Sequence, residues 1–275
     1  MDKVKHIICY SGGHSSARVA IEVINKYGVE NCMLLNHDIT ERSEDQDIKR
    51  FKNEIAEYLG ISITYANMIG WQDKDQFDVA IEEKAFKAIG IPALCTNRMK
   101  TRPFMKFLKE EFPDKNCVLY YGFDKDETDR MERRTRILGE AGYKVDYPLA
   151  TWEESIESTS EIGIEPPMSY SNFKHANCTG CLKAGAQHWY IVYCTRPDIF
   201  QKAKETEDII GYTIIKKMSL TDYEETFEKM KRLGVEPTEH VPFQTFWARV
   251  RRVIKEDEIA KFDLEVEAMP CMCTT

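Results

Sequence analysis

Short apolar segments alternate with longer segments of helical periodicity over the first 150 residues, and this alternation constrains the fold more than any other feature. Short continuous apolar runs are typical of buried strands, whereas apolar residues at three- and four-residue spacing are typical of one helix face. The expected strands are residues 5–10, 32–36, 62–65, 116–122 and 143–147. The expected helices are residues 14–27, 43–59, 77–89, 102–112 and 129–142. This order predicts an α/β fold with a Rossmann-like five-stranded parallel sheet that helices cover.

The sequence changes character after residue 150, because strand patterns disappear. Helical patterns follow one another instead, at residues 183–193, 222–233 and 242–255. Thr151 and Glu154 have the spacing of a capping box, which predicts a further helix that begins at Thr151. We therefore expect two parts, a sheet domain over residues 1–150 and a helical region over residues 151–275.

The composition limits the functional classes. Apolar residues make up 43% of the chain, which is enough to bury a core. The chain has no run of eighteen apolar residues and no basic and apolar leader, so we expect a cytoplasmic protein that does not enter a membrane. The net charge of −8 argues against a protein that coats nucleic acid. A local basic strip is typical of a solvated helix face and consists of Arg249, Arg251, Arg252 and Lys255.

The segment that follows the first expected strand has the composition of a phosphate-binding loop. It consists of Ser11, Gly12, Gly13, His14, Ser15 and Ser16. The N-terminus of the following helix attracts anions, the glycines let an anion approach the backbone, and the serine hydroxyls can donate hydrogen bonds. A glycine turn with a serine cap is the alternative interpretation. The loop differs from the Walker loop, because no lysine follows the glycines.

A second candidate position lies at the end of the second expected strand, where Asp38 follows Asn36 and His37. Ligands of doubly wound sheets bind outside the carboxyl ends of the strands. Asp38 is therefore a candidate contact for a nucleotide or a metal ion, and an aspartate that caps the loop is the alternative.

Nine cysteines are many for a chain of this length, and their odd number without a secretion signal argues against a disulfide framework. Four of them stand inside apolar runs, where a thiol behaves as a small hydrophobe: Cys9, Cys32, Cys117 and Cys194. Cys178 and Cys181 form a C-x-x-C pair, and Cys271 and Cys273 form a C-x-C pair near the end of the sequence. These four cysteines, with Cys95 as a fifth, are the candidate metal ligands, and thiolate ligands favour zinc or an iron-sulfur cluster.

Three short motifs resemble a known superfamily, the PP-loop adenine nucleotide α-hydrolases, and within it the phosphoadenylylsulfate reductases. The glycine-containing loop is similar to the usual S-G-G-x-D-S, with Ser15 in the position of the aspartate. Residues 95–103 are similar to the C-x-x-x-x-K-x-x-P segment of these reductases, and residues 121–133 resemble their segment with a glycine and two arginines. The resemblance implies that the loop binds an adenine nucleotide. It also implies that Lys100 and Arg133 surround the phosphates or the sulfate of that ligand.

The resemblance further implies a metal centre in the helical region. A cysteine well before a C-x-x-C pair resembles the cluster-binding arrangement of iron-sulfur adenylylsulfate reductases, which carry a Cys-Cys pair where this chain has Leu94-Cys95. The preferred ligand set for a 4Fe-4S cluster is Cys95, Cys178, Cys181 and Cys273. A zinc site with Cys271 among its ligands is the first alternative, and a redox dithiol of Cys178 and Cys181 is the second. His175 is a further candidate ligand, with a hydrogen-bonding role in the loop as its alternative.

These features predict an enzyme that binds ATP or a sulfonucleotide and carries out sulfur chemistry, either adenylation followed by thiolation of a substrate or reduction. Magnesium would accompany the phosphates. The Glu-Cys-Gly-x-His motif of the classical reductases is absent, which argues against simple sulfate reduction. An adenylating, amide-forming enzyme with structural zinc and a non-catalytic nucleotide-binding protein are the alternatives. The acceptor stays open, with nucleic acid as one option, and so does the assembly, with a homodimer as one option.

Overall fold

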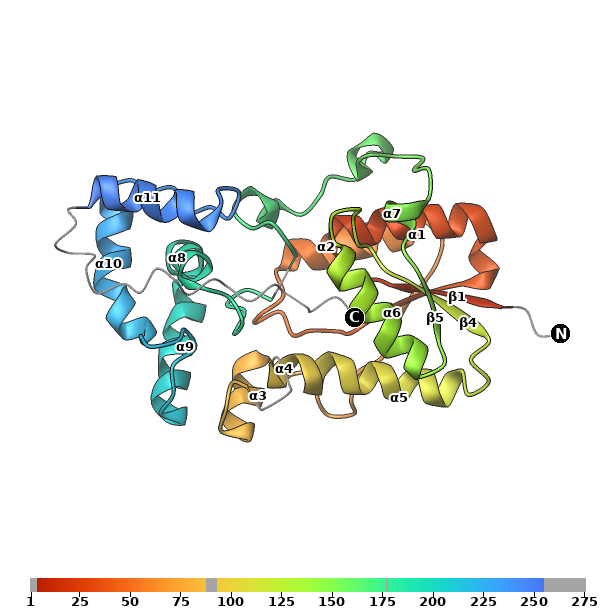
Figure 1. Ribbon diagram of the computed structural model, residues 1–275, viewed down its shortest axis with the longest axis horizontal. Coiled ribbons are helices and arrows are strands. Elements are labelled where there is room, and N and C mark those ends of the chain that lie inside the picture. The colour runs from red at the N-terminus through yellow and green to blue at the C-terminus, as the bar shows by residue number, and fades with distance from the viewer. Residues whose placement is uncertain (1–3, 88–92, 177, 255–275) are drawn as a thin grey trace.

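The computed structural model describes residues 4–87, 93–176 and 178–254, and its centre is a parallel sheet of five strands (Figure 1). The strands are β1 Lys5–Cys9, β2 Cys32–Asn36, β3 Ile63–Tyr65, β4 Cys117–Tyr120 and β5 Lys144–Asp146. All pairs are parallel and the order across the sheet is β3-β2-β1-β4-β5. The prediction of an α/β fold with a five-stranded parallel sheet is therefore confirmed.

Helices cover both faces of the sheet, as the apolar runs of its strands require. The helices α1 His14–Tyr27 and α2 Gln46–Tyr58 pack on one face, in a core with Ile8 of β1. The helices α5 Arg102–Glu111 and α6 Thr128–Glu140 pack on the other face, in a core with Ile7 of β1. Neighbouring residues of one central strand thus belong to two different cores.

The strand order reverses its direction at β1. The chain leaves β1 toward β2 and β3, and then returns to the opposite side of β1 for β4 and β5. The connections after β1 and after β4 therefore diverge, which opens a crevice at the carboxyl ends of these two strands. Any ligand of the sheet is expected at this position.

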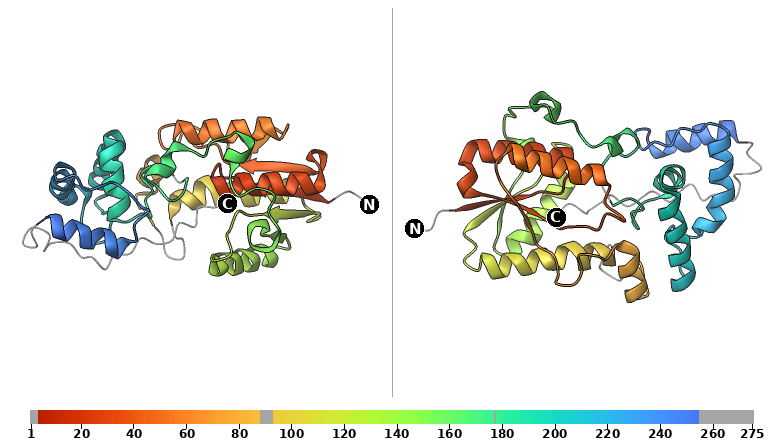
Figure 2. Two further views of the ribbon diagram at one scale, coloured as in Figure 1. Left: turned by 90° about the horizontal axis from the view of Figure 1, so that it is seen from above. Right: turned by 180° about the vertical axis from the view of Figure 1, so that it is seen from behind.

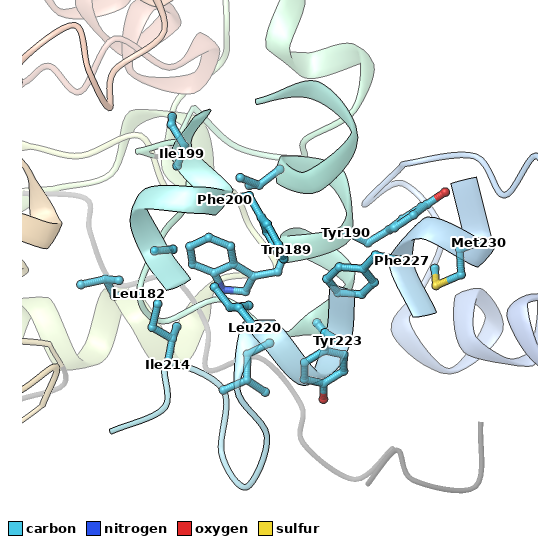
Figure 3. Close-up of a cluster of buried hydrophobic side chains, with 14 of the residues drawn as sticks. Leu182, Trp189, Tyr190, Ile199, Phe200, Ile214, Leu220, Tyr223, Phe227 and Met230 are labelled. Carbon is cyan, nitrogen blue, oxygen red and sulfur yellow. The ribbon is translucent and has the colours of Figure 1, made fainter. Parts of the chain in front are cut away.

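The helical region lies beside the sheet and has a core of its own (Figures 1 and 2). Its helices are α8 Ala186–Thr195, α9 Pro197–Ile210, α10 Leu220–Arg232 and α11 Phe243–Val253. Large aromatic side chains such as Trp189, Tyr190 and Phe227 fill this core (Figure 3). The helix α3 Gln76–Glu83 joins it through Phe77 and Ala80, although α3 precedes β4 in the sequence.

Three expectations about single elements need correction. Thr151 is the last residue of the short helix α7 Pro148–Thr151 and does not begin a helix, and Glu154 pairs with Arg18 instead of closing a capping box. The expected helix 77–89 ends at Glu83, because Lys84 adopts a left-handed conformation that terminates it. The helix α9 was not expected, although Pro197 at its start and Gly211 after its end are typical signals.

In the parts of the chain that the structure describes, six shorter elements connect the main ones. They are η1 Val29–Asn31, α4 Leu94–Thr96, the π-helical turn η2 Asn97–Thr101, α7, η3 Thr159–Ile162 and η4 Met168–Ser171. Within the described parts of the chain, no helix is both long and apolar enough to cross a membrane.

Candidate functional site

A cavity of about 400 Å³ lies at the carboxyl ends of β1 and β4. Cys9, the last residue of β1, forms part of its wall, and so do Tyr121 and Gly122, which follow β4 directly. This is the position at which the strand order reverses. The topology therefore agrees with a ligand position beside the loop that precedes α1.

The loop of residues 11–16, which we call the glycine loop, contributes four residues to the cavity: Ser11, Gly13, Ser15 and Ser16. Hydrogen bonds within the loop hold its shape, because Ser16 Oγ donates to the carbonyl oxygen of Gly13 at 2.8 Å and accepts from Ser11 Oγ at 3.2 Å. Gly13 caps α1 without any side-chain hydrogen bond. The first turn of α1 thus begins at the cavity wall.

Gly12 has a structural reason to be glycine. Its φ is +83°, and a Cβ there would lie 2.6 Å from the side chain of Lys52. The Lys52 side chain is buried, and its ammonium pairs with Glu44 Oε2 at 2.7 Å. Glu44 in turn lines the cavity, whereas Gly12 does not.

His14 turns its side chain away from the cavity. Its Nε2 accepts a hydrogen bond from the backbone N–H of Thr159 at 3.2 Å. Burial lowers the pKa of His14, which agrees with a neutral imidazole that accepts at this nitrogen. Of the residues expected to bind the nucleotide, Gly12 and His14 shape the loop and do not face the cavity.

The second wall of the cavity approaches the glycine loop at Gly122. A Cβ at Gly122 would lie 2.9 Å from both the carbonyl carbon of Ser15 and the nitrogen of Ser16. Backbone atoms cannot move aside as a flexible side chain can. Only glycine therefore allows the connection after β4 to pack against the start of α1.

Charged side chains of both signs line the cavity. Lys100, from the π-helical turn η2, is one of its cations, and π-helical turns are frequent at functional sites. Arg130 also lines the cavity, and its guanidinium pairs with Glu127 and lies 4.5 Å from the centre of the Phe123 ring. Arg133 is exposed and does not line the cavity. Of the two arginines in this segment, the structure thus places Arg130 at the site.

Asp38 does not line the cavity. Its Oδ1 accepts from Lys49 Nζ at 3.0 Å, and its backbone N–H donates to Asn67 Oδ1 at 2.8 Å. The carboxylates that do line the cavity are Glu44, Asp124, Asp126 and Glu127.

The C-x-x-C loop, residues 178–181, lies between the two parts of the molecule. Cys178 lines the cavity and Cys181 is buried. The side chain of Gln76 donates from Nε2 to the carbonyl oxygens of Thr179 at 2.8 Å and of Gly180 at 3.2 Å. The N–H of Thr179 donates to the carbonyl oxygen of Ser43 at 2.8 Å. The position of this loop is thus fixed from two directions.

A histidine of α8 orders the second cysteine. The backbone N–H of Cys181 donates to His188 Nε2 at 3.3 Å, and His188 Nδ1 lies 2.8 Å from Glu239 Oε1. His188 lowers the pKa of Glu239 against the opposing effect of burial. His175 lines the cavity, and burial lowers its pKa.

The expected metal ligands are partly brought together. Cys95 and Cys178 pack against the same small apolar cluster, which contains Leu94 and Met99. Cys273 and Cys271 lie outside the described residues. Among the residues that the structure describes, no three His, Cys, Asp or Glu side chains converge as a group that could hold a metal ion. The described cysteines therefore do not form a complete ligand set.

One residue at the site has no signal in the sequence. The hydroxyl oxygen of Tyr170, in η4, accepts a hydrogen bond from the backbone N–H of His14 at 3.0 Å, and Tyr170 lines the cavity. A Cβ at Gly13 would lie 3.1 Å from the same oxygen. The 3₁₀ helix η4 has only four residues, so periodicity could not indicate the direction of Tyr170, and only the fold brings it to the glycine loop.

Comparisons with family models, with curated proteins and with solved structures gave no match.

Proposed function

We propose that this chain is an enzyme that binds ATP or a related sulfonucleotide at the glycine loop and carries out sulfur chemistry at Cys178. The observation that supports the proposal most is a single cavity that Ser15, Ser16, Lys100 and Cys178 line together. These residues come from distant parts of the sequence. The cavity thus unites a helix N-terminus, a cation and a thiol.

The phosphates would bind at the start of α1. The helix dipole and the backbone N–H groups of the first turn favour an anion there, and the absence of a side-chain cap on Gly13 leaves room for one. Lys100 and Arg130 supply positive charge on the walls. The four carboxylates of the cavity oppose a bare anion, so cations must balance the phosphates on binding.

The expected reaction is attack of an acceptor oxygen on the α-phosphorus of ATP, with release of pyrophosphate. The bond between the α-phosphorus and the bridging oxygen breaks, and the acceptor is left as an adenylate. Lys100 and Arg130 would stabilise the negative charge that develops on the leaving pyrophosphate. A persulfide donor would pass its outer sulfur to the Cys178 thiolate and leave as a thiolate itself. The Cys178 persulfide would then attack the adenylated atom, the bond from that atom to the oxygen of AMP breaks, and AMP leaves. A thiol reductant would finally cleave the disulfide between Cys178 and the acceptor and release the thiolated product. In the reductive variant, a thiolate of this chain would attack the sulfur of a bound sulfonucleotide, and the bond from that sulfur to the phosphate oxygen breaks, so that the adenosine phosphate leaves and an S-sulfonate forms on the cysteine. A thiol reductant would then attack this cysteine sulfur and release sulfite as a disulfide forms.

The experiment follows the products of ATP labelled at the α-phosphate, incubated with the protein and candidate acceptors. AMP and pyrophosphate are expected, and a Cys178→Ser variant should still form them while losing the sulfur-containing product. ADP and orthophosphate would contradict the mechanism. If ATP gives no product, phosphoadenylylsulfate with a thiol reductant is the second substrate, and release of sulfite would support the reductive variant.

The alternatives give different products in the same assay. An amide-forming enzyme would release AMP and pyrophosphate, and Cys178→Ser would leave its product unchanged. A protein that only binds nucleotide would return both nucleotides intact.

A further inference from the structure

We propose that Tyr170 is a ligand-binding residue of the cavity, whose hydroxyl donates a hydrogen bond to a phosphate oxygen at the glycine loop. The inference rests on the proposed function, because it assigns a donor to the same phosphate position. Tyr170 lies after residue 150, in η4, before the first long helix of the helical region, α8. The phosphate site would thus be completed by a residue from outside the sheet domain.

The hydrogen-bonding of the Tyr170 oxygen indicates the direction of its proton. This oxygen accepts a hydrogen bond from the backbone N–H of His14 at 3.0 Å. A hydrogen bond from the backbone N–H of Ala176 also lowers the pKa of Tyr170. A phenol has one proton to donate in addition to the lone pairs that accept. Among the residues that the structure describes, the Tyr170 hydroxyl donates a hydrogen bond to none. An oxygen that accepts from the protein therefore keeps its donor for a ligand.

The surroundings of Tyr170 place that donor beside the start of α1. Gly13 caps the helix without a side-chain bond, and its hypothetical Cβ lies 3.1 Å from the Tyr170 oxygen. Ser15 and Ser16 line the same cavity, and within the described residues no hydrogen bond occupies their backbone N–H groups. The backbone N–H of His14 is bound to the Tyr170 oxygen, so the Tyr170 hydroxyl would donate to the ligand in its place. The backbone N–H groups of Ser15 and Ser16 stay available to the ligand.

Burial agrees with a donating hydroxyl. Burial raises the pKa of Tyr170, and the N–H groups of His14 and Ala176 oppose this only in part. The phenol therefore keeps its proton at neutral pH. A protonated phenol can donate to a phosphate oxygen, whereas a phenolate would repel it.

The first test measures binding of inorganic pyrophosphate by titration calorimetry to the unmodified protein, to Tyr170→Phe and to Tyr190→Phe. Tyr190 donates its hydroxyl to the carbonyl oxygen of Val235 in the helical region, so Tyr190→Phe is a matched loss of a hydroxyl far from the glycine loop. Tyr170→Phe should weaken pyrophosphate binding about tenfold or more, because hydrogen bonds to charged groups are the strong ones. Tyr190→Phe should leave the affinity unchanged.

The second test separates a donating role from a structural one. A fluorinated tyrosine at position 170 keeps the ring and the oxygen but ionises at lower pH. As the pH rises through its pKa, pyrophosphate affinity should fall relative to that of the unmodified protein. If the Tyr170 oxygen only accepted from the His14 N–H, ionisation would strengthen that hydrogen bond. A purely structural role therefore predicts no fall in pyrophosphate affinity. The other titratable and charged groups of the cavity are the same in both proteins and cancel in the comparison: Cys9, Glu44, Lys100, Tyr121, Asp124, Asp126, Glu127, Arg130, Lys174, His175 and Cys178.

Three results would overturn the inference alone: equal or tighter pyrophosphate binding by Tyr170→Phe, a flat pH comparison for the fluorinated protein, or equal weakening by Tyr190→Phe. No binding of pyrophosphate to the unmodified protein would overturn the inference together with the proposed function. Pyrophosphate binding without ATP binding would be a failure of the proposed function alone. If the Tyr170→Phe variant unfolds, the pH dependence of pyrophosphate affinity in the fluorinated protein tests the inference instead.

Discussion

At the scale of single residues, the cavity depends on glycines for two different reasons. Gly12 needs a backbone conformation with positive φ, whereas Gly122 needs the absence of a Cβ against the backbone of Ser15 and Ser16. The glycine loop itself could be predicted from the sequence, because Gly-Gly between a strand and a helix is a local signal. The fit of Gly122 against Ser15 could not, because it joins two segments that only the sheet order brings together.

Gly122→Ala should lower the free energy of unfolding by about 1–3 kcal/mol, because the new methyl group overpacks against backbone. It should also displace the start of α1 and weaken nucleotide binding. Gly139→Ala is the matched control, because a Cβ there meets no atom within 4 Å and the residue lies in α6. The control should stabilise the protein by up to about 1 kcal/mol. Urea unfolding measures the free energy of unfolding of both variants. Equal changes in the two would contradict the close packing of Gly122 against the start of α1.

The cysteines differ in their expected reactivity toward an alkylating reagent. Burial raises the pKa of Cys9 to about 12 and those of Cys32 and Cys117 to about 11, so these thiols stay protonated. Cys178 is partly exposed at the cavity. At about pH 8, after treatment with a chelator, Cys178 should be alkylated well before the three buried thiols. Mass spectrometry of peptides measures the order in which the cysteines are alkylated. Alkylation of Cys9 as fast as that of Cys178 would contradict the burial of Cys9.

At the scale of elements, the helix α3 holds the C-x-x-C loop in place through Gln76. The sequence predicted a helix near this position, but the direction of Gln76 depends on how α3 packs against α9. The helix α9 itself has recognisable signals in Pro197 and Gly211. The expected helix at Thr151 was wrong because the chain after α7 is extended, and the partner of Glu154 is a residue of α1.

Gln76→Leu should lower the free energy of unfolding by about 1–3 kcal/mol, because it leaves two buried carbonyl oxygens without their donor. It should also speed the alkylation of Cys178, since the loop loses one of its two anchors. Gln201→Leu is the control, because Gln201 donates to Glu205 on an exposed face. A Gln76 variant as stable as this control would contradict the anchoring role.

The cysteine assignment makes a prediction about metal content. If Cys178 is a ligand, Cys178→Ser should lower both the metal content and the thermal stability of protein purified without oxygen, because metal binding contributes to folding. Cys194→Ser should keep its metal, since Cys194 packs against the core of the helical region. About four irons per chain with a broad visible absorption would favour the iron-sulfur cluster, and one zinc would favour the alternative. Metal loss in both variants or in neither would contradict this division of the cysteines.

At the scale of the whole molecule, the site combines both expected parts of the chain. Residues before 150 supply the glycine loop and Lys100, and residues after 150 supply Tyr170, Lys174 and Cys178. The helix α3 lies in the first part by sequence but packs in the core of the helical region. Periodicity predicted the strands and most helices, because each pattern is local. It could not predict that Asp38 would turn to Lys49 while Glu44 faces the cavity, because this choice depends on how a loop folds over the sheet edge.

Phosphate binding at the glycine loop is tested by a calorimetric titration of ATP into the unmodified protein, Gly13→Val and Gly139→Val. A side chain at Gly13 would project toward the Tyr170 oxygen, 3.1 Å from the Cβ position, and would fill the place of the phosphates. At Gly139 a Cβ meets open space. We expect ATP binding by the unmodified protein and by Gly139→Val, and a loss of at least about 100-fold in affinity for a folded Gly13→Val. Unchanged ATP affinity in Gly13→Val would show that the phosphates do not bind at the glycine loop.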